Sequence, residues 1–106
     1  MHTAEDINNI LRKFIALAST EFPVRYCYLF GSYAKGNPGE YSDIDVAVVS
    51  DKFIGDRFED RENLAKFSLK TSYDLEVHPF KTEDFTEDNP FVKEIIETGI
   101  KIDLIN

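Results

Sequence analysis

Two apolar segments of this chain, at 24–30 and 43–50, are joined by a loop with little room for a helix. The loop at 31–42 contains three glycines and one proline, which interrupt regular structure. Parallel strands need a long crossover that is usually a helix, whereas antiparallel strands accept a plain loop. We therefore expect the two segments to pair antiparallel near the centre of a sheet, with one helical turn after Ser32.

The two ends of this loop carry groups that suit a phosphate and a metal ion. Gly31 and Ser32 follow the first predicted strand, and ten residues separate Ser32 from Asp43 at the start of the second. A glycine–serine turn can offer backbone N–H groups to phosphate oxygens. Alternate residues of a strand point to the same side, so Asp43 and Asp45 can hold one cluster of hard cations. The pattern is typical of a metal-dependent site that handles nucleotides.

Apolar spacing and capping residues predict three longer helices. Their expected ranges are 4–19, 57–70 and 90–98. Each begins after a residue type that caps helix N-termini, namely Thr3, Asp56 and Asn89. The apolar face of the second helix is expected from Phe58, Leu64, Ala65, Phe67 and Leu69.

The order of helices and strands predicts the fold class. A third strand is expected at 73–80, where Pro79 indicates a sheet edge or strand end, and a short fourth strand at 100–104. The helix at 57–70 allows a right-handed crossover into the third strand. We expect one α+β domain over 1–106, a two-layer α/β sandwich whose mixed sheet of three to four strands carries helices mainly on one face.

Composition excludes several classes of protein. The net charge is −8 and no basic stripe is visible, which argues against binding of long nucleic acid. No apolar run approaches the roughly 20 residues needed to cross a bilayer. The single cysteine, Cys27, cannot form an intrachain disulfide, so a reducing cytoplasm is the expected compartment.

A third carboxylate is needed if two divalent ions are to promote phosphoryl-type transfer. The strand at 73–80 offers Asp74 and Glu76, which share a side with His78. Glu76 is favoured because it lies nearer the strand centre, and Asp74 remains the alternative. The chosen carboxylate would bind metal and accept a proton from the attacking hydroxyl. His78 could act as a general base, but its position before Pro79 at a strand end favours a surface histidine.

Other polar residues have plainer interpretations or supporting roles. Ser32 is expected to contact the terminal phosphates, and Lys35 to add positive charge to a bound triphosphate. Arg57 and Arg61 lie on one side of the predicted second helix and could reach phosphate, but acidic neighbours favour a solvated helix face.

Gly31-Ser32, the ten-residue gap and Asp43-x-Asp45 resemble the signature of the DNA polymerase beta-like nucleotidyltransferase superfamily, and most closely its minimal single-domain members. The segments at 76–80 and 89–95 also look like parts of such proteins. The resemblance implies transfer of a nucleoside monophosphate, AMP from ATP above all, to a hydroxyl, with pyrophosphate released. It also implies that Asp43 and Asp45 bind Mg²⁺, two ions in all, and that Gly31 and Ser32 hold the nucleotide.

The resemblance also implies a partner. Minimal members are often encoded beside a helical HEPN-domain protein, and some act as antitoxins by adding AMP to a tyrosine of a HEPN toxin. The chain has no residues to spare for a second domain over the acceptor, so another chain, or a second copy in an oligomer, is expected to supply that surface. The alternatives are a non-catalytic nucleotide- or partner-binding subunit and transfer to a small molecule such as an aminoglycoside.

Overall fold

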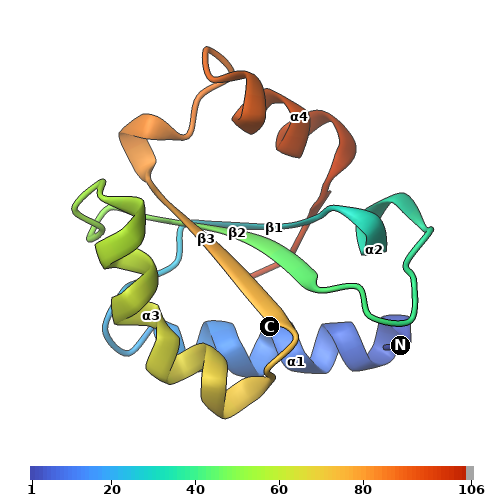
Figure 1. Cartoon of the computed structure of the whole chain (residues 1–106). Coiled ribbons are helices and arrows are strands. Elements are labelled where there is room, and N and C mark those ends of the chain that lie inside the picture. Colours follow the sequence, from blue (N-terminus) through green and yellow to red (C-terminus); the bar gives the residue numbers. More distant parts are fainter. Residues whose placement is uncertain (105–106) are drawn as a thin grey trace.

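The computed structural model describes residues 1–104, which form a sheet with helices on both sides (Figure 1). In chain order the elements are α1 (Ala4–Ala18), β1 (Tyr26–Phe30), α2 (Ser32–Lys35), β2 (Ile44–Ser50), α3 (Arg57–Thr71), β3 (Leu75–Lys81), a 3₁₀ turn (Thr82–Asp84), α4 (Pro90–Thr98) and β4 (Ile100–Lys101). None of the helices within this range is long and apolar enough to cross a membrane.

The sheet has the order β3-β2-β1-β4 and is mixed. β1 pairs antiparallel with β2, which confirms the expectation from the short loop, and antiparallel with β4 on its other side. β2 and β3 are parallel and are connected through α3. β3 lies at the edge of the sheet, where a proline is tolerated although it has no backbone N–H to donate to a neighbouring strand. The α+β class predicted from the sequence is therefore confirmed.

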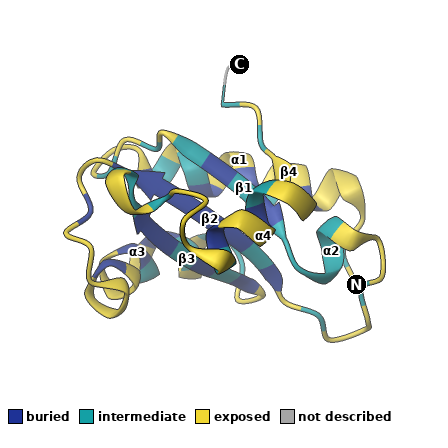
Figure 2. Ribbon diagram, turned by 90° about the horizontal axis from the view of Figure 1, so that it is seen from above, coloured by how far each residue is buried: buried dark blue, intermediate teal, exposed yellow. Residues whose placement is uncertain are grey.

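The two sides of the sheet carry different helices. α1 and α3 lie on one side, over the larger apolar cluster, and the shorter α4 covers the other (Figure 1). β2 is buried along nearly its whole length, as Figure 2 shows. Ala47 of β2 and Phe80 of β3 pack in the α4 cluster. Because strand residues alternate, Asp45 and His78 point to this same side.

The predicted N-caps are present. The Thr3 hydroxyl accepts a hydrogen bond from the Asp6 backbone N–H at 3.0 Å, and the Asp6 carboxylate accepts one from the Thr3 N–H at 2.9 Å. Asp56 caps α3, and Asn89 caps α4 by accepting from the N–H of Phe91. These caps set the residues at which α3 and α4 begin.

The apolar face predicted for α3 is only partly right. Leu64 and Phe67 are buried, but Phe58 is 79% exposed and Leu69 is 57% exposed. The position that completes the buried face is the charged Asp60, four residues before Leu64, and it is 2% exposed. A count of apolar residues could not identify this face, because one of its members is an aspartate.

Asp60 stabilises the turn that precedes α3. Its carboxylate oxygens accept hydrogen bonds from the backbone N–H groups of Ile54, at 3.1 Å, and Gly55, at 3.0 Å. A buried carboxylate is stable when such donors satisfy it. The two bonds tie the first turn of α3 to the loop that follows β2, and so help to position Arg57.

Cys27 is buried in β1 and has no disulfide partner. Burial raises the pKa of its thiol to about 12. The thiolate is the reactive form of cysteine, so this side chain acts as a small apolar residue of the core.

Two phenylalanines of α3 allow a matched test of this packing. Phe67→Ala is expected to lower the free energy of unfolding by about 3–5 kcal/mol, since Phe67 is 8% exposed and its removal leaves a cavity. Phe58→Ala, at a position 79% exposed, should change it by less than about 0.5 kcal/mol. Urea denaturation of both variants measures the difference, and equal losses would contradict this packing of α3.

Candidate active site

Two neighbouring strands, β2 and β3, bring two of the predicted carboxylates, Asp45 and Glu76, to one place. Phe30 at the end of β1 is opposite Asp45 of β2, and Asp45 is in turn opposite Glu76 of β3. Ligand atoms of Asp45, Glu76 and His78 all lie within 4.8 Å of one another. The cluster lies on the side of the sheet that α4 covers.

Asp43, just before β2, is exposed and adjoins this cluster through Glu76, but it is not one of the three residues whose ligand atoms come together. Its pKa is raised, first because its side chain shares a hydrogen bond with Glu76, and then through desolvation and the like charges of Glu76 and Asp74. Carboxylates crowded in this way disfavour their own ionisation. A divalent cation with oxygen ligands would relieve the repulsion, so the donor set fits Mg²⁺.

Gly31 lies directly against the Asp45 carboxylate. Its φ of 77° and ψ of −154° belong to a region that is essentially restricted to glycine. A Cβ atom at this position would lie 2.5 Å from Oδ2 of Asp45. The glycine therefore lets the backbone after β1 approach the acidic cluster, and this contact couples the two halves of the sequence motif.

The structure places Ser32 and Lys35 in α2, which begins immediately after Gly31. The Lys35 ammonium is directed to α4, where its Nζ lies 3.8 Å from an Oε atom of Glu94. Lys35 and Glu94 border on a small cavity of about 190 Å³ that Gly31 and Phe91 also line. Lys35 thus faces the space between α2 and α4 and makes no ion pair with the acidic cluster.

Asp74, the alternative third carboxylate, lies outside the cluster. It precedes β3, and its Oδ2 is 2.8 Å from Nε2 of His2. The His2 backbone N–H donates to the Tyr33 hydroxyl at 3.0 Å, so the N-terminal segment is held between Asp74 and α2. Of the two candidates, Glu76 shares the site with Asp45.

His78 belongs to the cluster, and the interpretation of it as a surface histidine is wrong. Its side chain is only 15% exposed, and its Nε2 lies 3.3 Å from Oδ1 of Asp45. The edge of the ring packs against Phe30, with centroids 5.0 Å apart. Burial lowers the pKa of His78, against the opposing effect of Asp45. Pro79 suggested a strand end, but β3 continues to Lys81, so His78 lies well inside the strand.

Two arginines of α3 also reach the site. Nη2 of Arg57 lies 3.2 Å from Nδ1 of His78, and Nη2 of Arg61 lies 3.3 Å from Oε1 of Glu76. The sequence places the two arginines on one side of the helix, but it does not predict these contacts, because they depend on how α3 packs beside β3. Both arginines are exposed, as predicted, and they bring positive charge to the outer edge of the acidic cluster.

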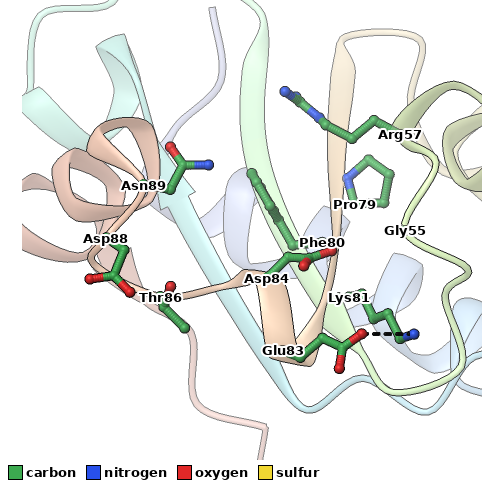
Figure 3. A pocket seen from close by; sticks show the side chains of 10 residues that line it. All are labelled: Gly55, Arg57, Pro79, Phe80, Lys81, Glu83, Asp84, Thr86, Asp88 and Asn89. Carbon is green, nitrogen blue, oxygen red and sulfur yellow. Dashed lines mark ion pairs between the residues drawn. The ribbon is translucent and has the colours of Figure 1, made fainter.

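A larger cavity of about 510 Å³ lies next to Arg57 (Figure 3). Arg57, Phe80, Lys81 and Glu83 line it, and the dashed line in Figure 3 marks the ion pair between Lys81 and Glu83, 2.9 Å long. Asp88 approaches from the segment before α4. The volume is within the range of small-molecule sites, and the shared Arg57 makes this cavity a neighbour of the acidic cluster.

Comparison with known sequences identifies the family. A model described as "Nucleotidyltransferase domain" matches residues 11–103. One protein of Methanocaldococcus jannaschii is 34% identical over 100 residues, which cover 94% of this chain and 97% of that protein. A second from the same organism is 30% identical over 105 residues, covering 99% of this chain and 79% of its own. Both are described as protein adenylyltransferases.

Solved structures show the same fold. A nucleotidyltransferase of Sulfolobus solfataricus has a TM-score of 0.60 at 18% identity, over 92% of this chain and 81% of its own. A mutant MntA–HpeT toxin–antitoxin has a TM-score of 0.59 at 26% identity, over 87% and 70%. A toxin–antitoxin with AMP-PNP has a TM-score of 0.56 at 26% identity, over 88% and 71%. The fold and the nearly full-length sequence matches agree, and the chain therefore belongs to the nucleotidyltransferase domain family.

Proposed function

We propose that this nucleotidyltransferase moves AMP from ATP onto a hydroxyl group of a partner protein in a Mg²⁺-dependent reaction. The observation that carries the proposal is that Asp45 and Glu76 lie together beside the backbone of Gly31, with Asp43 adjoining Glu76. Two relatives described as protein adenylyltransferases support the adenylyl group and the protein acceptor. The likeness to a toxin–antitoxin with AMP-PNP supports both a nucleotide and a partner.

Asp43, Asp45 and Glu76 would hold magnesium, two ions in all. When bound, such ions supply charge neutralisation at the phosphates and activation of the incoming hydroxyl. All three residues offer hard carboxylate oxygens, the ligand type that magnesium prefers. The net charge of −8 makes screening of this kind necessary for a triphosphate to approach.

Gly31, Ser32 and Lys35 would hold the nucleotide. Backbone N–H groups at the start of α2 and the Ser32 hydroxyl donate to phosphate oxygens, which can come close because residue 31 lacks a side chain. The exposed Lys35–Glu94 pair is long, at 3.8 Å, and such pairs are weak. Lys35 can therefore exchange Glu94 for a phosphate group.

The transfer step needs one proton acceptor. The acceptor hydroxyl oxygen forms a bond to the α-phosphorus of ATP as the bond to the bridging oxygen breaks, and pyrophosphate leaves. The hydroxyl proton passes to the Glu76 carboxylate and from there to water. The chain's own contribution is positioning and charge, as in phosphoryl transfer generally.

We infer further that the acceptor is a tyrosine of a helical HEPN-type toxin and that this chain acts as its antitoxin in a reducing cytoplasm. The likeness to MntA–HpeT supports the toxin–antitoxin pairing. The resemblance of Gly31-Ser32 and Asp43-x-Asp45 to minimal nucleotidyltransferases supports the tyrosine and the HEPN partner. The buried thiol of Cys27 is compatible with that compartment.

The partner can be tested by incubating the chain with ATP labelled at the α-phosphate, Mg²⁺ and the helical protein encoded beside it. Label on that protein, located on a tyrosine by mass spectrometry and absent from its Tyr→Phe variant, is expected. An aminoglycoside and the chain alone serve as the comparison acceptors. Efficient transfer to the aminoglycoside, or nucleotide binding with no transfer to the partner, would contradict the proposed function.

Glu76 and Asp74 provide a matched pair for the third metal ligand. Glu76→Gln is expected to weaken Mn²⁺ binding and slow transfer by at least about 100-fold, since even outer partners of a metal site cost 10- to 100-fold when removed. Asp74→Asn removes the same charge two residues away and should change both by only a few-fold, because Asp74 binds His2. Titration with Mn²⁺ followed by electron paramagnetic resonance measures affinity, and a larger loss in Asp74→Asn would exclude the Glu76 assignment.

A further inference from the structure

His78 and Arg57 form a chain of contacts that ends on Asp45. We propose that Arg57 holds the His78 imidazole in its Nε2–H tautomer, so that His78 donates a hydrogen bond to Asp45 and acts as a positioning residue and not as a metal ligand. This inference rests on the proposed function for its consequence in catalysis. The tautomer itself can be measured without any activity.

The contact with Arg57 determines which ring nitrogen carries the proton. Nη2 of Arg57 and Nδ1 of His78 are 3.2 Å apart. A guanidinium group has only donors and stays protonated in proteins, so Nδ1 must be the acceptor of this hydrogen bond. In the neutral imidazole the proton then resides on Nε2.

Aromatic packing keeps Arg57 in place. The centre of its guanidinium group lies 5.2 Å from the ring centroid of Phe80 and 5.6 Å from that of Phe91, within the range of a cation–π contact. Phe91, in the first turn of α4, also lies 6.1 Å from the His78 ring. The hydrogen bonds of Asp60 fix the turn just before Arg57. The Arg57 side chain is thus held by Phe80 of β3 and Phe91 of α4, and its backbone by the turn that Asp60 stabilises.

The other end of the chain of contacts fixes the Asp45 carboxylate. Nε2 of His78 lies 3.3 Å from Oδ1 of Asp45, and the proton on Nε2 points along this contact. The second oxygen, Oδ2, is the one that faces Gly31. Both oxygens of Asp45 therefore have a defined neighbour before any cation binds.

This arrangement keeps His78 out of the proposed ligand set although it lies in the cluster. The three groups that lie within 4.8 Å of one another are Asp45, Glu76 and His78. A protonated Nε2 has no lone pair for a metal, so His78 cannot be the third ligand while Arg57 occupies Nδ1. The ligand set that remains is all carboxylate, which favours magnesium or manganese over zinc.

The tautomer can be read by NMR of the full chain labelled with ¹⁵N in its imidazoles. The chain has two histidines, and the His2→Gln variant identifies the signals of the other. Above the pH at which a free imidazole ionises, about 6.5, His78 is expected to show a protonated Nε2 and an unprotonated Nδ1. The pattern should persist when Mg²⁺ is added. A proton on Nδ1, or loss of the Nε2 proton on addition of Mg²⁺, would overturn the proposal.

Removal of Arg57 tests the origin of the tautomer. In Arg57→Leu we expect signals of the Nδ1–H tautomer to appear beside those of the Nε2–H form, which the Asp45 carboxylate still favours, because nothing then donates to Nδ1. Lys66→Leu is the control, since Lys66 is an exposed cation of the same helix that pairs with Glu21 at 2.7 Å. It should leave the wild-type pattern unchanged. A pure Nε2–H tautomer in a folded Arg57→Leu would show that Arg57 does not determine it.

Two variants of His78 separate positioning from ligation. His78→Gln keeps an N–H donor near the place of Nε2 and should bind Mn²⁺ within about three-fold of wild type. His78→Leu removes the donor and should weaken Mn²⁺ binding by about 10- to 100-fold, as loss of an outer partner does. Equal weakening in both would indicate a metal ligand and overturn the proposal. If the wild-type chain shows the expected tautomer but transfers no AMP, the proposed function alone is contradicted.

Discussion

The double variant Asp43→Asn/Asp45→Asn should lose nucleotidyl transfer by about three orders of magnitude or more. The carboxylates would hold cations that contribute several kcal/mol to the transition state, and about 1.4 kcal/mol corresponds to a factor of ten in rate. The rate of label transfer from α-labelled ATP to the partner, at saturating Mg²⁺, measures the effect. Mn²⁺ binding should fall in parallel.

The same variant should remain folded. Asp43 and Glu76 repel each other in the protein without metal, and neutral side chains remove this repulsion. Thermal denaturation without Mg²⁺ should therefore give a melting temperature equal to or above that of the wild type. A variant that keeps more than about a tenth of the wild-type rate would contradict the assignment of these aspartates.

Gly31→Ala should lose both stability and activity. A methyl group would lie 2.5 Å from Oδ2 of Asp45, on a backbone with φ of 77° that strains any residue with a Cβ atom. Strain of this kind costs about 1–3 kcal/mol in the free energy of unfolding. Displacement of the Asp45 carboxylate should slow transfer by about 100-fold, the usual effect of a misplacement of 1 Å.

Gly36→Ala is the matched control. Gly36 lies in the same loop with φ of 78°, but a Cβ atom there would meet nothing within 4 Å. It should cost about 1–2 kcal/mol for backbone strain and leave transfer close to that of the wild type. Urea denaturation and the transfer assay on both variants give the comparison. Equal losses of activity would show that contact with Asp45 is not the reason for Gly31.

Local signals predicted most of the fold. Thr3, Asp56 and Asn89 cap their helices by hydrogen bonds to residues two or three positions away, so their effect is visible in the sequence. The antiparallel pairing of β1 and β2 followed from loop length and composition alone. In both cases the physical cause acts over a few neighbouring residues.

Contacts between distant segments were harder to predict. The choice between Asp74 and Glu76 depends on His2, which is 72 residues from Asp74 in the chain. The role of His78 depends on Arg57, 21 residues away on another element. The buried side of α3 includes Asp60 because two backbone N–H groups of the preceding turn satisfy it. No periodic pattern carries such information.

The chain is expected to transfer the AMP group of ATP, which carries the α-phosphate, and not the γ-phosphate. Parallel reactions with ATP labelled at either position, Mg²⁺ and the partner protein test this most directly. We expect the α-label on the partner, with the γ-label released in an equal amount as pyrophosphate. The γ-label on the partner would indicate a kinase, and bound ATP with neither label transferred would indicate a binding subunit. Either result would contradict nucleotidyl transfer at Asp43, Asp45 and Glu76.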